Sequence, residues 1–227
     1  MTEEATPTDR ATAPVQPDAN PAAPGRIPAS PGSPLAGARS EEAAGSDSVT
    51  EEQRQRRAAA LARLRSFGDP VLRSRASDVR DFDPDLVEEA ERMIAIMHDA
   101  MGVGLAATQL GIMRRLLVFQ AGSEATPATL VNPEFEWLSS EEAIAEEGCL
   151  SLPGIAVDVE RPLHARVRGS DVRGEEMLLE ASGLEARVLQ HEIDHLDGVL
   201  ILDRTSRDQR KQAMRALREA LEPRAAA

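Results

Sequence analysis

Two histidines on one face of a predicted helix could hold a metal ion. His191 and His195, in the segment QHEIDHLDG, are four residues apart, which on a helix leaves about 5–6 Å between their Cβ atoms. Glu192 lies beside the first histidine, where its carboxylate could reach a metal-bound water without being a ligand. The spacing predicts a metal site with its own proton acceptor; the alternative is an ordinary charged helix in which HExxH occurs by chance.

The third ligand decides which class of HExxH protein this is. One large group of zinc peptidases continues the motif to a third histidine, but this chain has Ile201 at that position, after the expected Gly198. Another group takes a glutamate from a later helix, and Glu219 is the available candidate, in a basic amphipathic stretch. Neither peptidase pattern is completed downstream of the two histidines.

Two upstream segments carry residues that could serve a hydrolytic metal site. MGVGLAATQLG, residues 101–111, combines glycines that let a ligand approach the main chain with Gln109, whose amide could donate a hydrogen bond to a developing negative charge. EEGCLSLPG, residues 146–154, contains Cys149, the one cysteine of the chain. A lone cysteine is more often a small buried hydrophobe, and a glycine-containing apolar loop is more often a turn into a strand.

The composition limits the compartment and the partners. The formal net charge of -13 argues against attraction of the whole surface to nucleic acid or to an anionic membrane. A single cysteine permits no intramolecular disulfide, which is typical of a reducing compartment. No apolar run approaches the roughly 18 residues that a membrane-spanning helix needs, and the N-terminus lacks the apolar core of a signal peptide. We therefore expect a cytoplasmic protein without a DNA or membrane partner.

Composition also divides the chain into three parts. Residues 1–55 are rich in Ala, Pro, Ser and Gly and poor in large apolar residues, which predicts a disordered N-terminal extension; a docking or regulatory segment is the alternative. Residues 56–205 form the predicted folded domain that contains the three segments above. Residues 206–227 form a predicted basic, amphipathic C-terminal helix and tail, with arginines throughout.

The elements that position these segments predict an α+β domain. Asp83 can cap a helix that starts at Pro84. Apolar residues then recur at three- and four-residue spacing as far as Met101, which supports this helix. Short strands are predicted at 115–119, 129–131, 135–138, 155–159, 164–168 and 177–180. A strongly acidic turn is predicted after residue 138, and the metal-binding helix begins at Gly183. We expect antiparallel strands packed around this central metal-binding helix, with the C-terminal amphipathic helix outside.

The segments GVGLAATQLG, EEGCLSLPG and QHEIDHLDG, in this order and spacing, closely resemble the three motifs of peptide deformylases. FGDPVLR near the beginning and VNPEF before the acidic stretch extend the likeness to about residues 64–204. The resemblance implies a metal-dependent amidohydrolase that removes the N-formyl group from the N-terminal methionine of newly made polypeptides and releases formate. Its implied partners are these formylated nascent peptides.

The resemblance also implies the catalytic centre. Cys149, His191 and His195 are the implied ligands of one divalent metal ion, with water completing an open site. The family points to Fe(II), while Zn(II), Ni(II) and Co(II) also suit this ligand set. Glu192 is then the proton carrier between water and the leaving amine, and Gln109 is an oxyanion donor.

The remaining implied roles concern the oxyanion and the substrate. The backbone N–H of Leu150 is the second protein donor to the oxyanion. The substrate-binding residues implied by matching positions are Val103, Gly104, Leu184 and Val188. Gly104 and its neighbours would let the peptide backbone add as an extra strand, which suits an enzyme that treats many sequences alike.

Two further functions compete with this hypothesis, and one partner is added to it. A metallopeptidase of HExxH type would need the downstream ligand Glu219, and a non-catalytic metal-stabilised binding module would need a closed coordination sphere. The basic C-terminal helix could contact the ribosome, where the substrate appears, because its arginines offset the acidic charge of the body.

Overall fold

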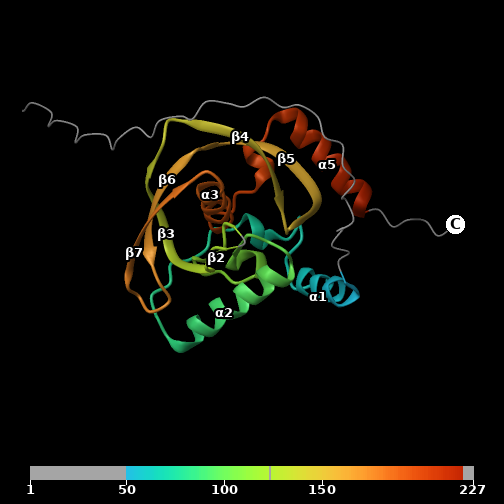
Figure 1. Cartoon of the computed structure of the whole chain (residues 1–227). Helices are drawn as coiled ribbons and strands as arrows, with labels where there is room; N and C mark the ends of the chain where they lie inside the picture. The colour runs from blue at the N-terminus through green and yellow to red at the C-terminus, as the bar shows by residue number, and fades with distance from the viewer. Residues whose placement is uncertain (1–49, 123, 222–227) are drawn as a thin grey trace, which may run out of the picture. The chain divides into compact units, whose positions relative to one another are not determined.

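The computed structural model describes residues 50–122 and 124–221, in which the strands follow one another in the middle of the sequence and helices lie at both ends (Figure 1). The helices are α1 (Glu51–Leu61), α2 (Pro84–Asp99), α3 (Leu184–Leu196), α4 (Ile201–Arg204) and α5 (Arg207–Leu221), with 3-10 turns η1 (Pro70–Arg73) and η2 (Ala107–Leu110). The strands are β1 (Gly104–Ala106), β2 (Leu116–Phe119), β3 (Ala128–Leu138), β4 (Glu142–Cys149), β5 (Leu152–Pro162), β6 (His164–Ser170) and β7 (Glu176–Ser182).

The strands form two antiparallel sheets around α3. One has the order β1-β2-β3-β6-β7, and the other pairs β4 with β5. Figure 1 shows α3 enclosed by these curved strands, with α2 on the outside. Leu189, Ile193 and Leu196 of α3 are buried against the inner face of the larger sheet. The predicted α+β fold with a central helix is confirmed.

The helix predicted from Pro84 is α2. Asp83 caps it by accepting a hydrogen bond from the backbone N–H of Leu86 at 2.9 Å, and Pro84 occupies the first turn, where its missing N–H costs nothing. Met93 and Met97, from the predicted apolar stripe, are fully buried beside Leu105 and Leu116. The stripe is therefore core at Met93 and Met97, whereas Met101, which follows the end of α2, is 63% exposed.

Two predicted strands, 129–131 and 135–138, are one continuous strand, β3. The prediction broke it at Asn132-Pro133 because proline cannot donate to a ladder. Pro133 is accommodated by a shift in the β3–β6 register between Val131 and Glu134. Asn132 has φ 50°, and its side-chain amide satisfies both the N–H and the C=O of Val79. An asparagine at positive φ thus carries the chain through the irregularity.

The acidic turn predicted after residue 138 is wrong, because most of it is strand β4. Its partner β5 pairs with it residue by residue, from Glu142 opposite Pro162 to Gly148 opposite Ala156. Glu142 and Glu146 face solvent, whereas Glu147 is buried. The charged residues on the exposed face prevented the prediction of this strand, which is stabilised by backbone pairing.

Both ends of the described chain refine the predicted boundaries. α1 begins at Glu51, where Thr50 and Gln53 form a capping box, so residues 51–55 are helical and the predicted disordered extension is wrong for them. The rest of that extension, residues 1–49, lies outside the described residues, as do 222–227. The C-terminal helix is α5, whose Ala213 and Leu217 are buried against a core cluster shared with β5. None of the helices in the described residues combines the length and apolarity needed to cross a bilayer.

Candidate metal centre

Cys149, His191 and His195 meet at one point. Their ligand atoms lie within 4.8 Å of one another. The two histidines come from one face of α3, with ring centroids 5.0 Å apart and rings inclined by 70°. Cys149 ends β4 at a shift in the β4–β5 register, and its Sγ lies 3.1 Å from Nε2 of His195. One thiol and two imidazoles suit a divalent transition metal such as zinc or iron, so the donor set fits the metal that the sequence implies.

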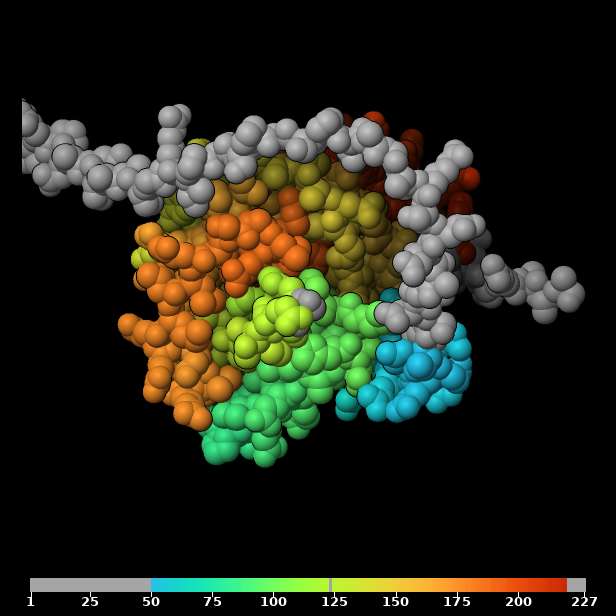
Figure 2. All heavy atoms as spheres, viewed as in Figure 1, coloured from blue at the N-terminus to red at the C-terminus, as the bar shows by residue number. Residues whose placement is uncertain are grey.

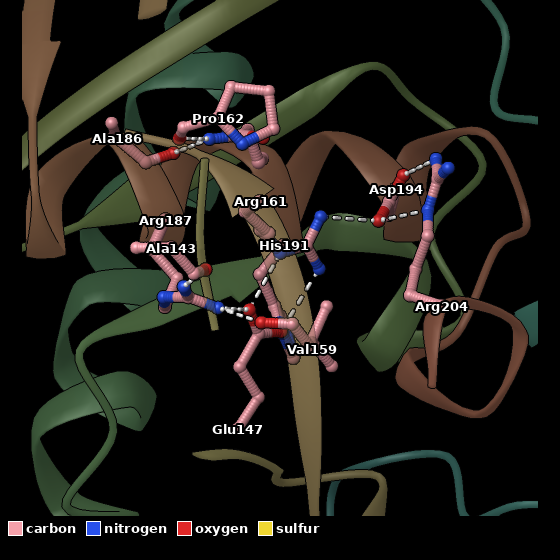
Figure 3. Close-up of polar contacts among 11 residues, drawn as sticks. Ala143, Glu147, Val159, Arg161, Pro162, Ala186, Arg187, His191, Asp194 and Arg204 are labelled. Carbon is pink, nitrogen blue, oxygen red and sulfur yellow. Dashed lines mark hydrogen bonds and ion pairs between the residues drawn. The ribbon is translucent and has the colours of Figure 1, made fainter. Parts of the chain in front are cut away.

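Glu147 holds His191 in place from behind. Its carboxylate accepts a hydrogen bond from Nδ1 of His191 at 3.0 Å and two more from Arg161, at 2.6 and 3.0 Å (Figure 3). Burial alone would raise the pKa of Glu147, but the hydrogen bonds from His191 and Arg161 lower that pKa to about 2. A bond to Nδ1 leaves Nε2 of His191 for the metal, since the two ring nitrogens then have separate partners.

The carboxylate of Asp194 binds two arginines and makes no hydrogen bond to His191 or His195. Its carboxylate binds the guanidinium of Arg161 at 2.8 Å and that of Arg204 at 2.5 Å (Figure 3). Arg161 therefore bridges Asp194 and Glu147, so α3, β4 and β5 are joined by one buried chain of charges. Asp194 thus ties α3 to β5 and α4.

Glu192 is buried beside the candidate ligand group of Cys149, His191 and His195. A Cβ on Gly104 would lie 2.3 Å from its Oε1, so only glycine allows β1 to approach this carboxylate. Oε2 has no hydrogen-bond partner among the described residues. Burial raises the pKa of Glu192 to about 7, and the opposing effect of His191 is smaller. A carboxylate in this setting can take up and release a proton near neutral pH.

The side-chain amide of Gln109, in η2, is oriented by a residue of β1. Its Oε1 accepts a hydrogen bond from the backbone N–H of Ala106 at 3.0 Å. Nε2 is thereby turned toward Ser151 Oγ at 3.3 Å and Cys149 Sγ at 3.8 Å. The donor end of this buried amide faces the metal ligands. The adjacent Thr108 donates its hydroxyl hydrogen to the backbone carbonyl of His195 at 3.1 Å, which fixes this turn to α3.

A cavity of about 410 Å³ opens beside these groups. Each residue predicted for the site lines it except His195, which lies behind it and is 1% exposed. Leu150 follows Cys149 at its edge. Val103 and Leu184 are 47% and 56% exposed although apolar, whereas Val188 is buried deeper in the wall. Exposed apolar side chains around a cavity indicate that an apolar ligand covers them.

Sequence reasoning missed several residues of this site. Glu147 lies in the segment EEGCLSLPG without a predicted role, and its position directly before the Gly-Cys pair was the available signal. Arg161 had none, because it lies on β5, outside the three motifs. Glu219 forms an ion pair with Arg215 on α5 at 2.8 Å and does not belong to the ligand group. The downstream ligand of a metallopeptidase is thus not supplied by Glu219.

The fold and the ligand group define a metal-dependent amidohydrolase. A sequence model of the polypeptide deformylase family matches residues 61–211. The chain belongs to this family, whose members are metal-dependent hydrolases that remove the N-formyl group from nascent polypeptides. The family resemblance seen in the three motifs is confirmed.

Individual relatives agree with this assignment. A peptide deformylase of Acidothermus cellulolyticus is 48% identical over 157 residues, which are 69% of this chain and 86% of that protein. The crystal structure of the Thermotoga maritima peptide deformylase is 49% identical, covers 63% of this chain and 97% of its own, and superposes with a TM-score of 0.62. The Synechococcus elongatus peptide deformylase, in complex with actinonin, is 40% identical with a TM-score of 0.65, over 67% and 85% of the two chains.

Proposed function

We propose that this chain removes the formyl group from the N-terminal methionine of newly made polypeptides in the cytoplasm, with Cys149, His191 and His195 as ligands of one Fe(II) ion. The convergence of one thiol and two imidazoles beside a buried carboxylate carries the proposal. A divalent ion held by such ligands supplies a Lewis acid and lowers the pKa of water. Glu147 contributes by orienting the imidazole of His191.

Glu192 acts as the proton carrier. Its carboxylate accepts a proton from the attacking water and delivers it to the amine that leaves when the C–N bond of the formamide breaks. Burial supports this role, because it raises the pKa of Glu192 to about 7 and so makes both uptake and release accessible near neutral pH. Gly104 supports it as well, by leaving space for the carboxylate at the cavity wall.

Gln109 and Leu150 stabilise the charge that develops on the formyl oxygen. The Nε2 group of Gln109 already faces Cys149, so it can donate to an oxygen held in the cavity at little reorganisation cost. The backbone N–H of Leu150 is the second donor in the proposal, since Leu150 follows the cysteine at the cavity edge. The products are formate and a peptide with a free α-amine.

Methionine specificity comes from the apolar wall. Val103, Leu184 and Val188 line the cavity and would contact the methionine side chain. β1 is the edge strand of the larger sheet, so the peptide can add beside it through main-chain hydrogen bonds. Such bonds are independent of sequence, as required for an enzyme with many substrates.

A formate-release assay tests the proposal. Purified protein is expected to release formate from formyl-Met-Ala-Ser. Glu192→Gln is expected to retain the metal, measured by elemental analysis, and to lose about 10²–10⁴-fold in kcat, the range for one acid–base group. Full turnover by Glu192→Gln would exclude the proton-carrier role. Inhibition by actinonin, which occupies the Synechococcus elongatus relative, provides an independent check.

The choice of Fe(II) needs its own measurement. The ligand set accepts several divalent ions, so availability decides which is bound. Protein purified without oxygen is expected to contain about one iron per chain and to lose activity in air as the iron oxidises. Stoichiometric zinc in protein prepared without oxygen, with full and air-stable activity, would contradict the iron assignment.

We also propose that α5 contacts the ribosome. Arg207, Lys211 and Arg218 are exposed and make no ion pair with any described residue, while Arg215 pairs only with Glu219. Deleting α5 would expose the core that Ala213 and Leu217 help to bury, so a charge change is the cleaner test. Lys211→Gln with Arg218→Gln is expected to weaken ribosome co-sedimentation and its salt dependence. Arg166→Gln, on β6, is the matched control, and equal binding by both variants would refute the contact.

A further inference from the structure

Helix α1 supplies two residues to the substrate cavity, Arg57 and Leu61. They are four residues apart and therefore share a face of the helix. Leu61 packs against the core cluster that also includes Leu150 and Met97, which anchors the end of α1. Figure 2 shows α1, in blue, at the surface beside α2. All of α1 except Leu61 precedes the residues that the family model matches.

Arg57 is the uncompensated cation of the cavity. On the same helix, Arg54 and Arg56 are neutralised by Glu51 and Glu52 at 2.9 and 2.7 Å. Arg57 is exposed and forms no ion pair or hydrogen bond with any residue in the described ranges. The other cavity arginine, Arg187, binds Glu147 and two backbone carbonyls. Only Arg57, among the described cavity-lining residues, therefore has a guanidinium available to a ligand.

We propose that Arg57 is a specificity-determining residue that binds an acidic side chain of the formylated peptide beyond its methionine. The inference rests on the proposed function. The ligand group receives the formyl end and the apolar wall the methionine, so the following residues must leave through the open side of the cavity. Arg57 lies in that lining and is exposed, which places its charge within reach of the departing chain.

A negative charge in the cavity lining makes the expected substrate preference depend on position. Glu146, on β4, is exposed in the lining and belongs to a different element from Arg57. Substrates with an acidic residue near Arg57 are expected to bind more tightly, and so are substrates with a basic residue near Glu146. Because both groups are solvated, each preference is a few-fold effect and weakens with salt. Main-chain binding alone would produce neither preference.

Competition between charged peptides tests the role of Arg57. The substrates are formyl-Met-X-Ala-Ala and formyl-Met-Ala-X-Ala with X as Asp or Lys, and the readout is the ratio of kcat/KM for Asp over Lys at each position. Arg57→Gln is expected to lower this ratio about threefold at one position, within the range of exposed ion pairs, and Arg57→Glu about tenfold, because charge reversal applies the change twice. Both changes are expected to vanish in about 1 M salt, where the screening length is about 3 Å.

Arg56→Gln is the matched control, since Arg56 is adjacent, equally basic and outside the cavity lining. Its Asp-to-Lys ratio is expected to equal that of the unmodified chain. An unchanged ratio in both Arg57 variants, or an equal change in Arg56→Gln, would overturn the inference alone. Failure of the unmodified chain to release formate from any of the four peptides would overturn the proposed function together with this inference.

Discussion

Glu147 receives a hydrogen bond from Nδ1 of His191 at 3.0 Å while its carboxylate is held by Arg161. Glu147→Gln keeps the shape but removes the charge, so it should weaken metal binding about 10–100-fold, as for other groups that orient a metal-bound histidine. It should also lower the free energy of unfolding by about 3–5 kcal/mol, because Arg161 stays buried with less compensation. Chelator competition and denaturant unfolding measure the two effects. The control is Glu142→Gln, at an exposed position of the same strand.

A substitution at Gln109 can keep the orientation of the side chain while removing the N–H group proposed for catalysis. In Gln109→Glu the carboxylate can still accept the hydrogen bond from Ala106 N–H, but it has no N–H to offer an oxyanion. The expected loss is about 10²–10³-fold in kcat, typical of one oxyanion donor, with little change in KM. Steady-state kinetics on formyl-Met-Ala-Ser give both constants. A rise in KM at constant kcat would assign Gln109 to substrate binding instead.

Gly104→Ala tests the approach of β1 to the catalytic carboxylate. The added Cβ would lie 2.3 Å from Oε1 of Glu192, so the carboxylate or the strand must move. A displacement of about 1 Å costs roughly 100-fold in rate, and we expect a loss of that order in kcat. Metal content should stay normal, because Cys149 and the two histidines lie on other elements. Activity within about twofold of the unmodified chain would show that Glu192 tolerates the shift.

The hydroxyl group of Thr108 is expected to stabilise the fold, although Thr108 has no proposed role in the reaction. Its hydroxyl group bonds the carbonyl of His195 at 3.1 Å, and both groups are buried. Thr108→Val should lower the free energy of unfolding by about 1 kcal/mol, the usual contribution of one hydrogen bond. Thr108→Ser keeps the hydroxyl and is the control. Equal unfolding midpoints for the valine variant and the unmodified chain would remove Thr108 from the contacts that hold α3.

The sequence predicted those parts of the fold that depend on local rules. Asp83 and Pro84 mark the start of α2, and the spacing of His191 and His195 places both on one face of α3. The pairing of distant segments was beyond local rules. The acidic strand β4 has no apolar alternation to reveal it, and Asn132-Pro133 looks like a break until the register shift is seen.

Site prediction followed the same division. The resemblance of the three motifs assembled Cys149 with the histidines, which spacing alone left open. Residues that act through other residues were not predictable in this way, because their partners are set by tertiary contacts. Arg161 does not line the cavity, and Arg57 lies before the family match. A sequence pattern therefore identifies the reacting groups more easily than it identifies the residues that position those groups or select the substrate.

The bridge formed by Arg161 between Glu147 and Asp194 limits how this protein can change over generations. Replacing Arg161 leaves two buried carboxylates with fewer partners, and replacing either carboxylate leaves Arg161 with one partner instead of two, at a cost of up to about 3–5 kcal/mol. That is a large share of the 5–15 kcal/mol by which a domain is usually stable. Single replacements are therefore strongly destabilising. Joint replacement by apolar residues of similar volume need not lower the stability, but it would remove the hydrogen bond between Glu147 and His191. We expect the three positions to vary together among descendants of this chain, or not at all.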